Sequence, residues 1–271
     1  MSTPPSVQLY SVRDAVADDL SGTVARLAEI GFTKVEPYGF ADAPDATAAA
    51  LTAAGVTAPT GHAAVIDADD AERFFEAAKT IGLETVIDPF IPSDRWQTAD
   101  DVAAIAERVN VLTEQAAGYG LRFGYHNHQW EFVNKVDGRS VYDLFVEQIS
   151  AATVLEVDTF WATVGGADAP ALLRSLGDRV VALHIKDGKV SGDIATALPS
   201  SESALVVPDA LKAAFEQQTP AGQGDVDVTA ILAAAPAALR VVEFDAYAGD
   251  VFEGIAESYA WLAENDTEAR A

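Results

Sequence analysis

Residues 154–186 read VLEVDTFWATVGGADAPALLRSLGDRVVALHIK and contain two strand-like runs on either side of a helical segment. Residues 154–158 and 180–185 are rich in Val, Leu and Ile, which is typical of buried strands, whereas residues 170–176 have apolar positions at helical spacing. Gly177 follows the helical segment, where a left-handed C-terminal cap favours this residue type. The stretch therefore predicts one βαβ unit with two parallel strands.

The same alternation continues toward both ends of the chain and yields eight strand–helix units. Strands are expected at residues 7–10, 34–37, 58–62, 85–88, 122–127, 154–158, 180–185 and 241–244. Helices are expected at residues 20–30, 47–54, 71–81, 99–119, 141–150, 170–176, 228–234 and 252–264. Eight such units predict an α/β fold, a (β/α)8 TIM barrel that forms a single domain over residues 1–271.

One long segment, residues 187–227, interrupts this regular alternation. It contains turn signals such as Pro199-Ser200-Ser201, and residues 209–217 have the spacing of a helix. Loops of this length inside a barrel are usually functional or carry a helix of their own. We expect this excursion to lie over the mouth of the barrel.

The composition excludes several classes of partner and site. Because 42 Asp and Glu oppose 17 Lys and Arg, the net charge is −25, and such a surface repels nucleic acid and anionic membranes. The chain has no Cys, so it has neither disulfides nor thiolate ligands. It shows no targeting or membrane-spanning pattern. We expect a soluble cytoplasmic protein, and the sequence leaves open whether it forms a homo-oligomer.

All four histidines fall at the carboxyl ends of expected strands, where barrel enzymes place their chemistry. They are His62 at the end of the third strand, His126 and His128 at the end of the fifth, and His184 near the end of the seventh. A single histidine at such a position is as easily structural as functional. Four at one end of the barrel predict a polar site there.

Carboxylates occupy equivalent strand ends: Glu36, Glu131, Asp158, Asp187, Glu243 and Asp245. In an acidic chain most carboxylates are solvated, but Asp158 and Glu243 lie in apolar runs that demand burial. A buried carboxylate is costly unless it is paired or binds a metal. Strand alternation also places Glu156 and Asp158 on the same face of their strand, and His184 and Lys186 on the same face of theirs.

Imidazoles with two or three carboxylates and no thiolate suit Mn2+, Co2+, Mg2+, Fe2+ or Zn2+. One such divalent metal ion can hold sugar oxygens and stabilise the charge that forms when a carbon-bound proton leaves. A carboxylate beside it could act as the base, and Lys186 could hold an oxyanion. The chain has no serine nucleophile elbow, phosphate-binding loop or dinucleotide-binding motif, so other chemistries fit less well.

Several motifs along the chain match one known family. They are VQLYSVR at 7–13, GFTKVE at 31–36, GH at 61–62, YHNHQWEF at 125–132, LEVDTFW at 155–161, LHIKD at 183–187, GQGDVD at 222–227 and VE at 242–243. With these motifs in this order, the chain resembles the xylose-isomerase-like TIM barrel superfamily. The resemblance is to the bacterial sugar phosphate isomerase/epimerase proteins, which are related to inosose dehydratases.

The resemblance implies one divalent metal ion held by residues of the fifth to eighth strands. Carried over to this chain, these are Asp158, His184 and Glu243, with either Glu131 or His126 from the fifth strand. Glu131 is favoured because the family block pairs it with the histidines. Epimerases of this superfamily exchange a proton through two glutamates, so Glu131 and Glu243 would be both ligands and acid/base groups.

The chain also departs from its relatives. Members with three metals have a histidine where this chain has Trp161, and the long segment after His184 carries no cluster of Arg or Lys for a phosphate. We therefore expect one metal and an uncharged polyhydroxylated substrate. The expected substrate contacts are Glu36, His62, His126, His128 and Lys186, with Trp130 and Trp161 as apolar walls.

The leading hypothesis is a metal-dependent isomerase or epimerase acting on a sugar, keto-sugar or cyclitol. Its central step would be proton abstraction next to a carbonyl, with Glu243 as the first choice of base. One alternative is a lyase of the inosose-dehydratase or 3-keto-glycoside type on the same site. Another is a non-catalytic sugar-binding subunit, which a missing ligand would favour, but Asp158, His184 and Glu243 are all present.

Overall fold

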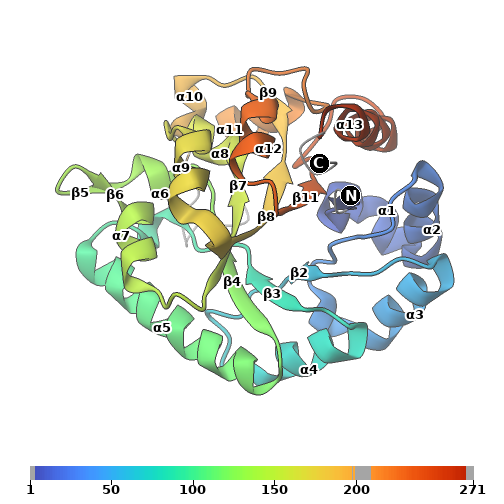
Figure 1. Cartoon of the computed structure of the whole chain (residues 1–271), viewed down its shortest axis with the longest axis horizontal. Helices are drawn as coiled ribbons and strands as arrows, with labels where there is room; N and C mark the ends of the chain where they lie inside the picture. The colour runs from blue at the N-terminus through green and yellow to red at the C-terminus, as the bar shows by residue number, and fades with distance from the viewer. Residues whose placement is uncertain (1–3, 197, 199–208, 267–271) are drawn as a thin grey trace.

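The computed structural model describes residues 4–196, 198 and 209–266, in which a curled parallel sheet is surrounded by helices (Figure 1). Seven strands pair in the order β1 (Ser6–Val7), β11 (Leu239–Val242), β8 (Val180–Ile185), β7 (Val154–Asp158), β4 (Arg122–His126), β3 (Thr85–Asp88) and β2 (Thr60–His62). Every neighbouring pair in this sheet is parallel. Parallel pairing with helical crossovers confirms the predicted α/β arrangement.

Residues 34–38 lie between β1 and β2 and close the ring. They form isolated parallel bridges, which pair Gln8 with Glu36, Lys34 with Thr57 and Tyr38 with His62. The predicted strand at 34–37 is thus present only as bridges, because Pro37 has no backbone N–H to donate to a ladder. The eight segments together give the predicted (β/α)8 TIM barrel.

The first strand is shorter than predicted. β1 ends at Val7, and residues 9–12 form the 3-10 helix η1 (Leu9–Val12). The cause is local: the side chain of Gln8 accepts a hydrogen bond from the backbone N–H of Tyr10 at 3.1 Å, which favours a turn over an extended strand. Tyr10 therefore lies at the barrel mouth, where it is 41% exposed.

The outer layer contains the eight predicted helices. They are α2 (Leu20–Ile30), α3 (Pro44–Ala54), α4 (Glu72–Ile81), α5 (Ala99–Gly118), α7 (Val141–Gln148), α9 (Ala169–Leu176), α12 (Val228–Ala234) and α13 (Val251–Asn265). Helix α5 begins with a capping box between Thr98 and Asp101. Gly55 and Gly82 end α3 and α4 with φ of 68° and 88°, as expected of glycine caps. None of the described helices combines the length and apolarity that a membrane crossing requires.

Several short elements were not predicted. They are α1 (Arg13–Asp18), η2 (Phe40–Asp42), η3 (Ser93–Arg95), α6 (Trp130–Val133), β5 (Lys135–Val136), β6 (Arg139–Ser140), α8 (Thr159–Val164) and η4 (Gly177–Arg179). The excursion after β8 contains β9 (Asp187–Gly188), α10 (Gly192–Ala195), α11 (Asp209–Glu216) and β10 (Gln218–Thr219). The helix predicted at 209–217 is therefore present. The turn signal at 199–201 lies outside the described residues.

The strands send their apolar side chains outward to the helices and their polar side chains inward. On β7, Leu155 and Val157 belong to the main hydrophobic core, whereas Glu156 and Asp158 do not. The barrel interior has a small apolar cluster of Ala182, Leu239 and Val241. Glu156 pairs in register with Ala182 of this cluster, and His184 lies two residues further along β8; both are fully buried. Period-two alternation therefore explains why charged groups gather inside the barrel.

We expect Gly124→Ala to destabilise the barrel. In β4, a Cβ at this position would lie 2.7 Å from both Ile87 Cδ1 and the carbonyl oxygen of Val154, and the backbone atom cannot move away easily. Overpacking of this kind should lower the free energy of unfolding by about 1–3 kcal/mol. Urea denaturation would measure it. As a control, Gly118→Ala at the end of α5 meets nothing within 4 Å and should not destabilise.

Candidate active site

A pocket of about 730 Å3 opens at the carboxyl ends of the strands. Its lining includes His62, His126, His128, Trp130, Trp161, Lys186, Glu243 and Asp245. A second hollow, of about 850 Å3, is lined by Lys34, Glu84, Arg122 and neighbouring residues at the opposite end and contains none of the predicted site residues. Because chemistry in (β/α)8 barrels sits at the carboxyl ends, the first pocket is the candidate site.

Aromatic side chains form the upper wall of the pocket. The rings of His128 and Trp130 are stacked at 4.3 Å between centroids with an interplanar angle of 5°, and Phe90 packs edge-on against both. On another side, Trp161 and Phe215 of α11 contact each other with centroids 5.8 Å apart. Trp130 and Trp161 thus lie where walls were predicted. Phe90 and Phe215 were not predicted, although Phe215 belongs to the helix expected over the mouth.

Three side chains, Asp158, His184 and Glu243, lie together at the floor of the pocket. They are called the upper set. One ligand-type atom from each lies within 4.8 Å of the others, and all three residues are buried. His184 Nδ1 makes a short contact with Glu243 Oε2. Lys186 Nζ lies 2.9 Å from Asp158 Oδ2 and 2.7 Å from Glu243 Oε2. It also lies 3.0 Å from Asp245 Oδ2.

The charges of the upper set depend on one another. Burial alone would lower the pKa of Lys186, but Asp158, Asp245 and Glu243 raise it well above its usual value. Burial would also raise the pKa of Glu243, yet the positive charges of His184 and Lys186 hold it well below the ordinary range. For Asp158, burial prevails over the attraction of Lys186 and raises the pKa to about 6. The floor therefore contains a carboxylate held ionised beside an ammonium group.

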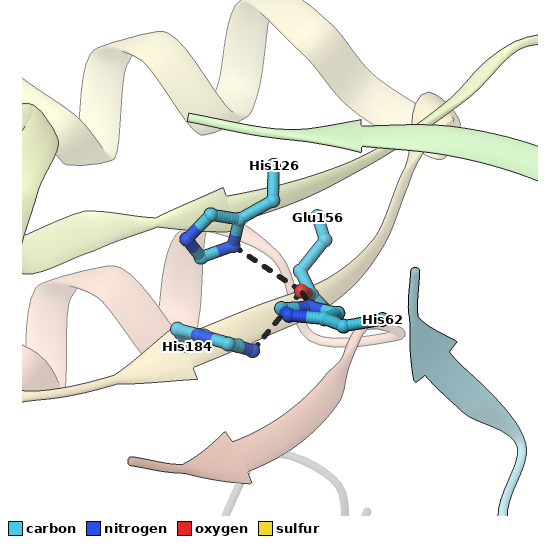
Figure 2. A group of neighbouring side chains, drawn as sticks. All are labelled: His62, His126, Glu156 and His184. Carbon is cyan, nitrogen blue, oxygen red and sulfur yellow. Dashed lines mark hydrogen bonds and ion pairs between the residues drawn. The ribbon is translucent and has the colours of Figure 1, made fainter. Parts of the chain in front are cut away.

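A second set, called the lower set, consists of His62, His126, His184 and Glu156, and its three imidazoles surround the carboxylate (Figure 2). Glu156 Oε1 lies 2.5 Å from His62 Nε2, 3.0 Å from His184 Nε2 and 3.2 Å from His126 Nδ1. The rings of His62 and His184 are stacked with centroids 5.1 Å apart. His184 belongs to both sets, because its two nitrogens face opposite ways.

Glu36 was predicted to contact substrate, but it is fully buried and does not line the pocket. Its carboxylate accepts hydrogen bonds from Gln8 Nε2 at 2.7 Å and from the hydroxyl of Thr60. It also lies 2.8 Å from His184 Nε2. The structure thus places Glu36 beneath the site, against the lower set.

Glu131 was favoured as the fifth-strand ligand, and the structure does not bring it together with the upper set. It lies in α6 rather than on β4, and both its oxygens are engaged. Tyr125 donates its hydroxyl to one oxygen at 2.6 Å, and the backbone N–H of His128 donates to the other at 2.9 Å. Burial raises the pKa of Glu131 to about 8. His126 was the alternative fifth-strand ligand. The distance between its Nε2 and Asp158 Oδ2 is 3.9 Å.

Asp187, another strand-end carboxylate, has a structural role. It accepts hydrogen bonds from the backbone N–H groups of Gly188, Gly222, Gly224 and Val226. It therefore fixes the loop at 222–226 against the end of β8. Asp245 and Glu156, in contrast, join the site although the sequence did not single out a role for either.

A family model described as xylose isomerase-like TIM barrel matches residues 24–263. No curated protein matches the chain. Among solved structures, a sugar phosphate isomerase/epimerase from Parabacteroides distasonis ATCC 8503 is 21% identical, with a TM-score of 0.71 over 97% of this chain and 94% of that chain.

Two further solved structures are similar in fold. The IolI protein, solved with a bound zinc atom, is 13% identical, with a TM-score of 0.68 over 98% of this chain and 99% of that chain. The 3-keto-D-glucoside 4-epimerase YcjR from E. coli is 16% identical, with a TM-score of 0.64 over 91% of this chain and 95% of that chain. At these identities the likeness shows a shared fold.

Proposed function

The chain belongs to the xylose isomerase-like TIM barrel family, and within it we propose a metal-dependent sugar isomerase or epimerase that removes a proton next to a carbonyl. The observation that carries this proposal is the convergence of Asp158, His184, Glu243 and Lys186 on the floor of an aromatic-walled pocket. The site offers acid/base groups, a cationic group and a binding wall in one place.

The upper set fits one divalent cation. Its donor atoms are carboxylate oxygens and imidazole nitrogens, which suit Mn2+, Co2+, Mg2+, Fe2+ or Zn2+. Asp158, His184 and Glu243 would hold the ion, and we propose His126 as the fourth ligand in place of Glu131. The carboxylates already surround a cationic group, the ammonium of Lys186. A bound ion would act as a Lewis acid that polarises the substrate oxygens.

Glu243 is the proposed base. Its carboxylate is kept ionised by His184 and Lys186, and it is part of the pocket lining, so it can reach a carbon-bound proton of a ligand. Lys186 Nζ lies 2.7 Å from this carboxylate. We propose that its ammonium donates to the oxygen that gains negative charge as the proton leaves.

The proposed substrate is an uncharged polyhydroxylated ring or chain. Flat aromatic faces such as the His128–Trp130 stack suit the apolar face of a sugar ring. The Arg13 guanidinium already donates to the carbonyl oxygens of Tyr10 and Asp245, and Lys186 is paired with carboxylates. The three carboxylates around Lys186, those of Asp158, Glu243 and Asp245, disfavour a phosphate at this point of the pocket.

Two measurements test the proposal. Elemental analysis of the purified protein should give about one divalent metal ion per chain. A screen of sugars, keto-sugars and cyclitols in D2O should find substrates that gain solvent deuterium at the carbon beside the carbonyl. Loss of a β-substituent after the same exchange would identify a lyase. A protein that binds sugars without metal and without turnover would be a sugar-binding subunit, and phosphate-dependent tight binding would contradict an uncharged substrate.

A further inference from the structure

We propose that Gln218 is a positioning residue that fixes the carboxylate of Asp245, which in turn holds the ammonium of Lys186 in place. Asp245 and Lys186 line the pocket, whereas Gln218 lies behind them in β10, in the excursion after β8. The inference deepens the proposed function and rests on the role proposed there for Lys186.

The ammonium of Lys186 has three carboxylate partners, and they differ in what else they do. Nζ lies 2.9 Å from Asp158 Oδ2 and 2.7 Å from Glu243 Oε2, and it donates to the two oxygens of Asp245 at 3.1 and 3.0 Å. Asp158 and Glu243 are also proposed to hold the metal ion, whereas Asp245 belongs to neither the upper nor the lower set. Asp245 can therefore hold the flexible lysine side chain whether or not the ion is bound.

The carboxylate of Asp245 needs a contact that keeps it turned inward. It shares one ammonium with two other carboxylates, each within 3.0 Å of the same Nζ, so the three repel one another. Its side chain is 14% exposed, so water offers it another environment. Strand β11 ends at Val242, and the strand therefore no longer sets the direction of this side chain.

Gln218 provides this contact with both ends of its amide. Nε2 donates to Asp245 Oδ2 at 2.6 Å, and Oε1 accepts from the backbone N–H of Asp245 at 2.8 Å. Because the carboxylate can only accept and the backbone N–H can only donate, this bonding fixes which way the amide faces. Gln218 is 2% exposed, so water does not compete for the amide. The pair thus fixes the direction of the carboxylate relative to its own backbone.

The backbone of Gln218 is itself fixed to the segment that carries Lys186. β10 pairs antiparallel with β9, where Gln218 lies opposite Gly188, two residues after Lys186. A Cβ at Gly188 would lie 2.9 Å from the carbonyl oxygen of Gln217, so glycine allows the two strands to approach. On the other side of Asp245, Arg13 donates to its carbonyl oxygen at 3.0 Å. Asp245 is therefore held from two sides.

The same excursion contributes to the pocket wall. Phe215 of α11 lies three residues before Gln218, lines the pocket and contacts Trp161. One segment of the chain thus supplies a wall for the ligand and the support of the cationic group.

The first test is structural and requires no substrate. Crystal structures of the metal-free wild type and of Gln218→Leu should be compared, because leucine is similar in size but has neither hydrogen-bonding group. In wild type, Lys186 Nζ should contact Asp245. In Gln218→Leu, the carboxylate should turn away, and its oxygens should lie beyond the about 4 Å of an ion pair from Nζ.

The second test separates catalysis from binding, with a substrate found in the sugar screen. Gln218→Leu should lower kcat by up to about 100-fold, the effect that a displacement of about 1 Å can have. KM should stay close to the wild-type value, because the ammonium is proposed to act on charge that forms only in the transition state. The double variant with Asp245→Asn should be no slower than Asp245→Asn alone, since both changes affect one contact.

A matched control replaces another glutamine of the excursion. Gln223 is exposed, and its Nε2 donates to Glu257 Oε2 at 2.9 Å. Gln223→Leu should leave the position of Lys186 and kcat unchanged. If Gln218→Leu does not fold, Gln218→Asn replaces it, because it keeps the amide but is shorter by one methylene and should release Asp245 in the same way.

The outcomes are distinct. The inference is wrong if Lys186 Nζ stays in contact with Asp245 in a folded Gln218 variant. It is also wrong if the two single losses of kcat multiply in the double variant, because Gln218 would then act by another route. If wild type turns over no sugar, the proposed function fails, while the crystal structures still decide whether Gln218 positions Asp245 and Lys186.

Discussion

Replacing Glu243 with Gln should lower turnover by at least about 100-fold, the effect typical of losing a general base. The amide keeps the size of the side chain but cannot accept a proton from carbon. The structure places this carboxylate in the pocket lining, beside His184 and Lys186, which keep it ionised. Exchange of solvent deuterium into the product should be seen with wild type and lost in the variant, and proton NMR of the product would measure both.

Because Glu243 is also a proposed ligand, turnover of Glu243→Gln must be measured at saturating metal with the bound metal quantified. Near-normal turnover with metal bound would show that another group is the base. Glu131→Gln tests the alternative in which Glu131 is the base. The Glu131 carboxylate already accepts hydrogen bonds from the hydroxyl of Tyr125 and the backbone N–H of His128. A larger loss in Glu131→Gln than in Glu243→Gln would reverse the assignment. Turnover without deuterium exchange would instead indicate a hydride shift.

The fold was predictable wherever one strand carries a clear apolar signal. β3, β7 and β8 have the predicted bounds, because their side chains are buried against helices or in the barrel. The segments at 7–10 and 34–37 differ because single side chains override the pattern. Gln8 turns the chain by capping the N–H of Tyr10, and Pro37 interrupts the ladder. Such local hydrogen-bonding effects do not appear in the hydrophobic spacing.

The site was predictable on the strands and one residue beyond them, where Lys186 and Glu243 line the pocket. Alternation places Glu156 and Asp158 on one face, and the structure has both inside the barrel. Beyond His126 the strand ends, so alternation no longer gives the direction of a side chain. Glu131 lies five residues further, in α6, and its direction depends on the turn that precedes it. The partnership of Glu156 with histidines from three other strands is a tertiary feature that no local pattern contains.

His184 should be the residue whose loss affects the site most. Its ring lies among three carboxylates, Glu36, Glu156 and Glu243, and its Nδ1 belongs to the upper set. His184→Ala should therefore abolish metal binding, seen as less than about one tenth of the wild-type metal content, since loss of even an outer-shell partner typically costs about 10–100-fold in metal affinity. It also leaves carboxylates facing each other without a cation, which costs about 3–5 kcal/mol of stability.

A loss of that size is a large part of the about 5–15 kcal/mol that stabilises a typical domain, so a second variant is needed. His184→Gln keeps an amide donor for the carboxylates but offers no imidazole lone pair, and it should fold and still lack metal. The matched control is His128→Ala, which removes a histidine at the same end of the barrel. Its ring stacks on Trp130 and belongs to neither set, so metal content should stay at the wild-type level. Full metal occupancy in a folded His184 variant would exclude His184 as a ligand, and with it the proposed arrangement of the upper set.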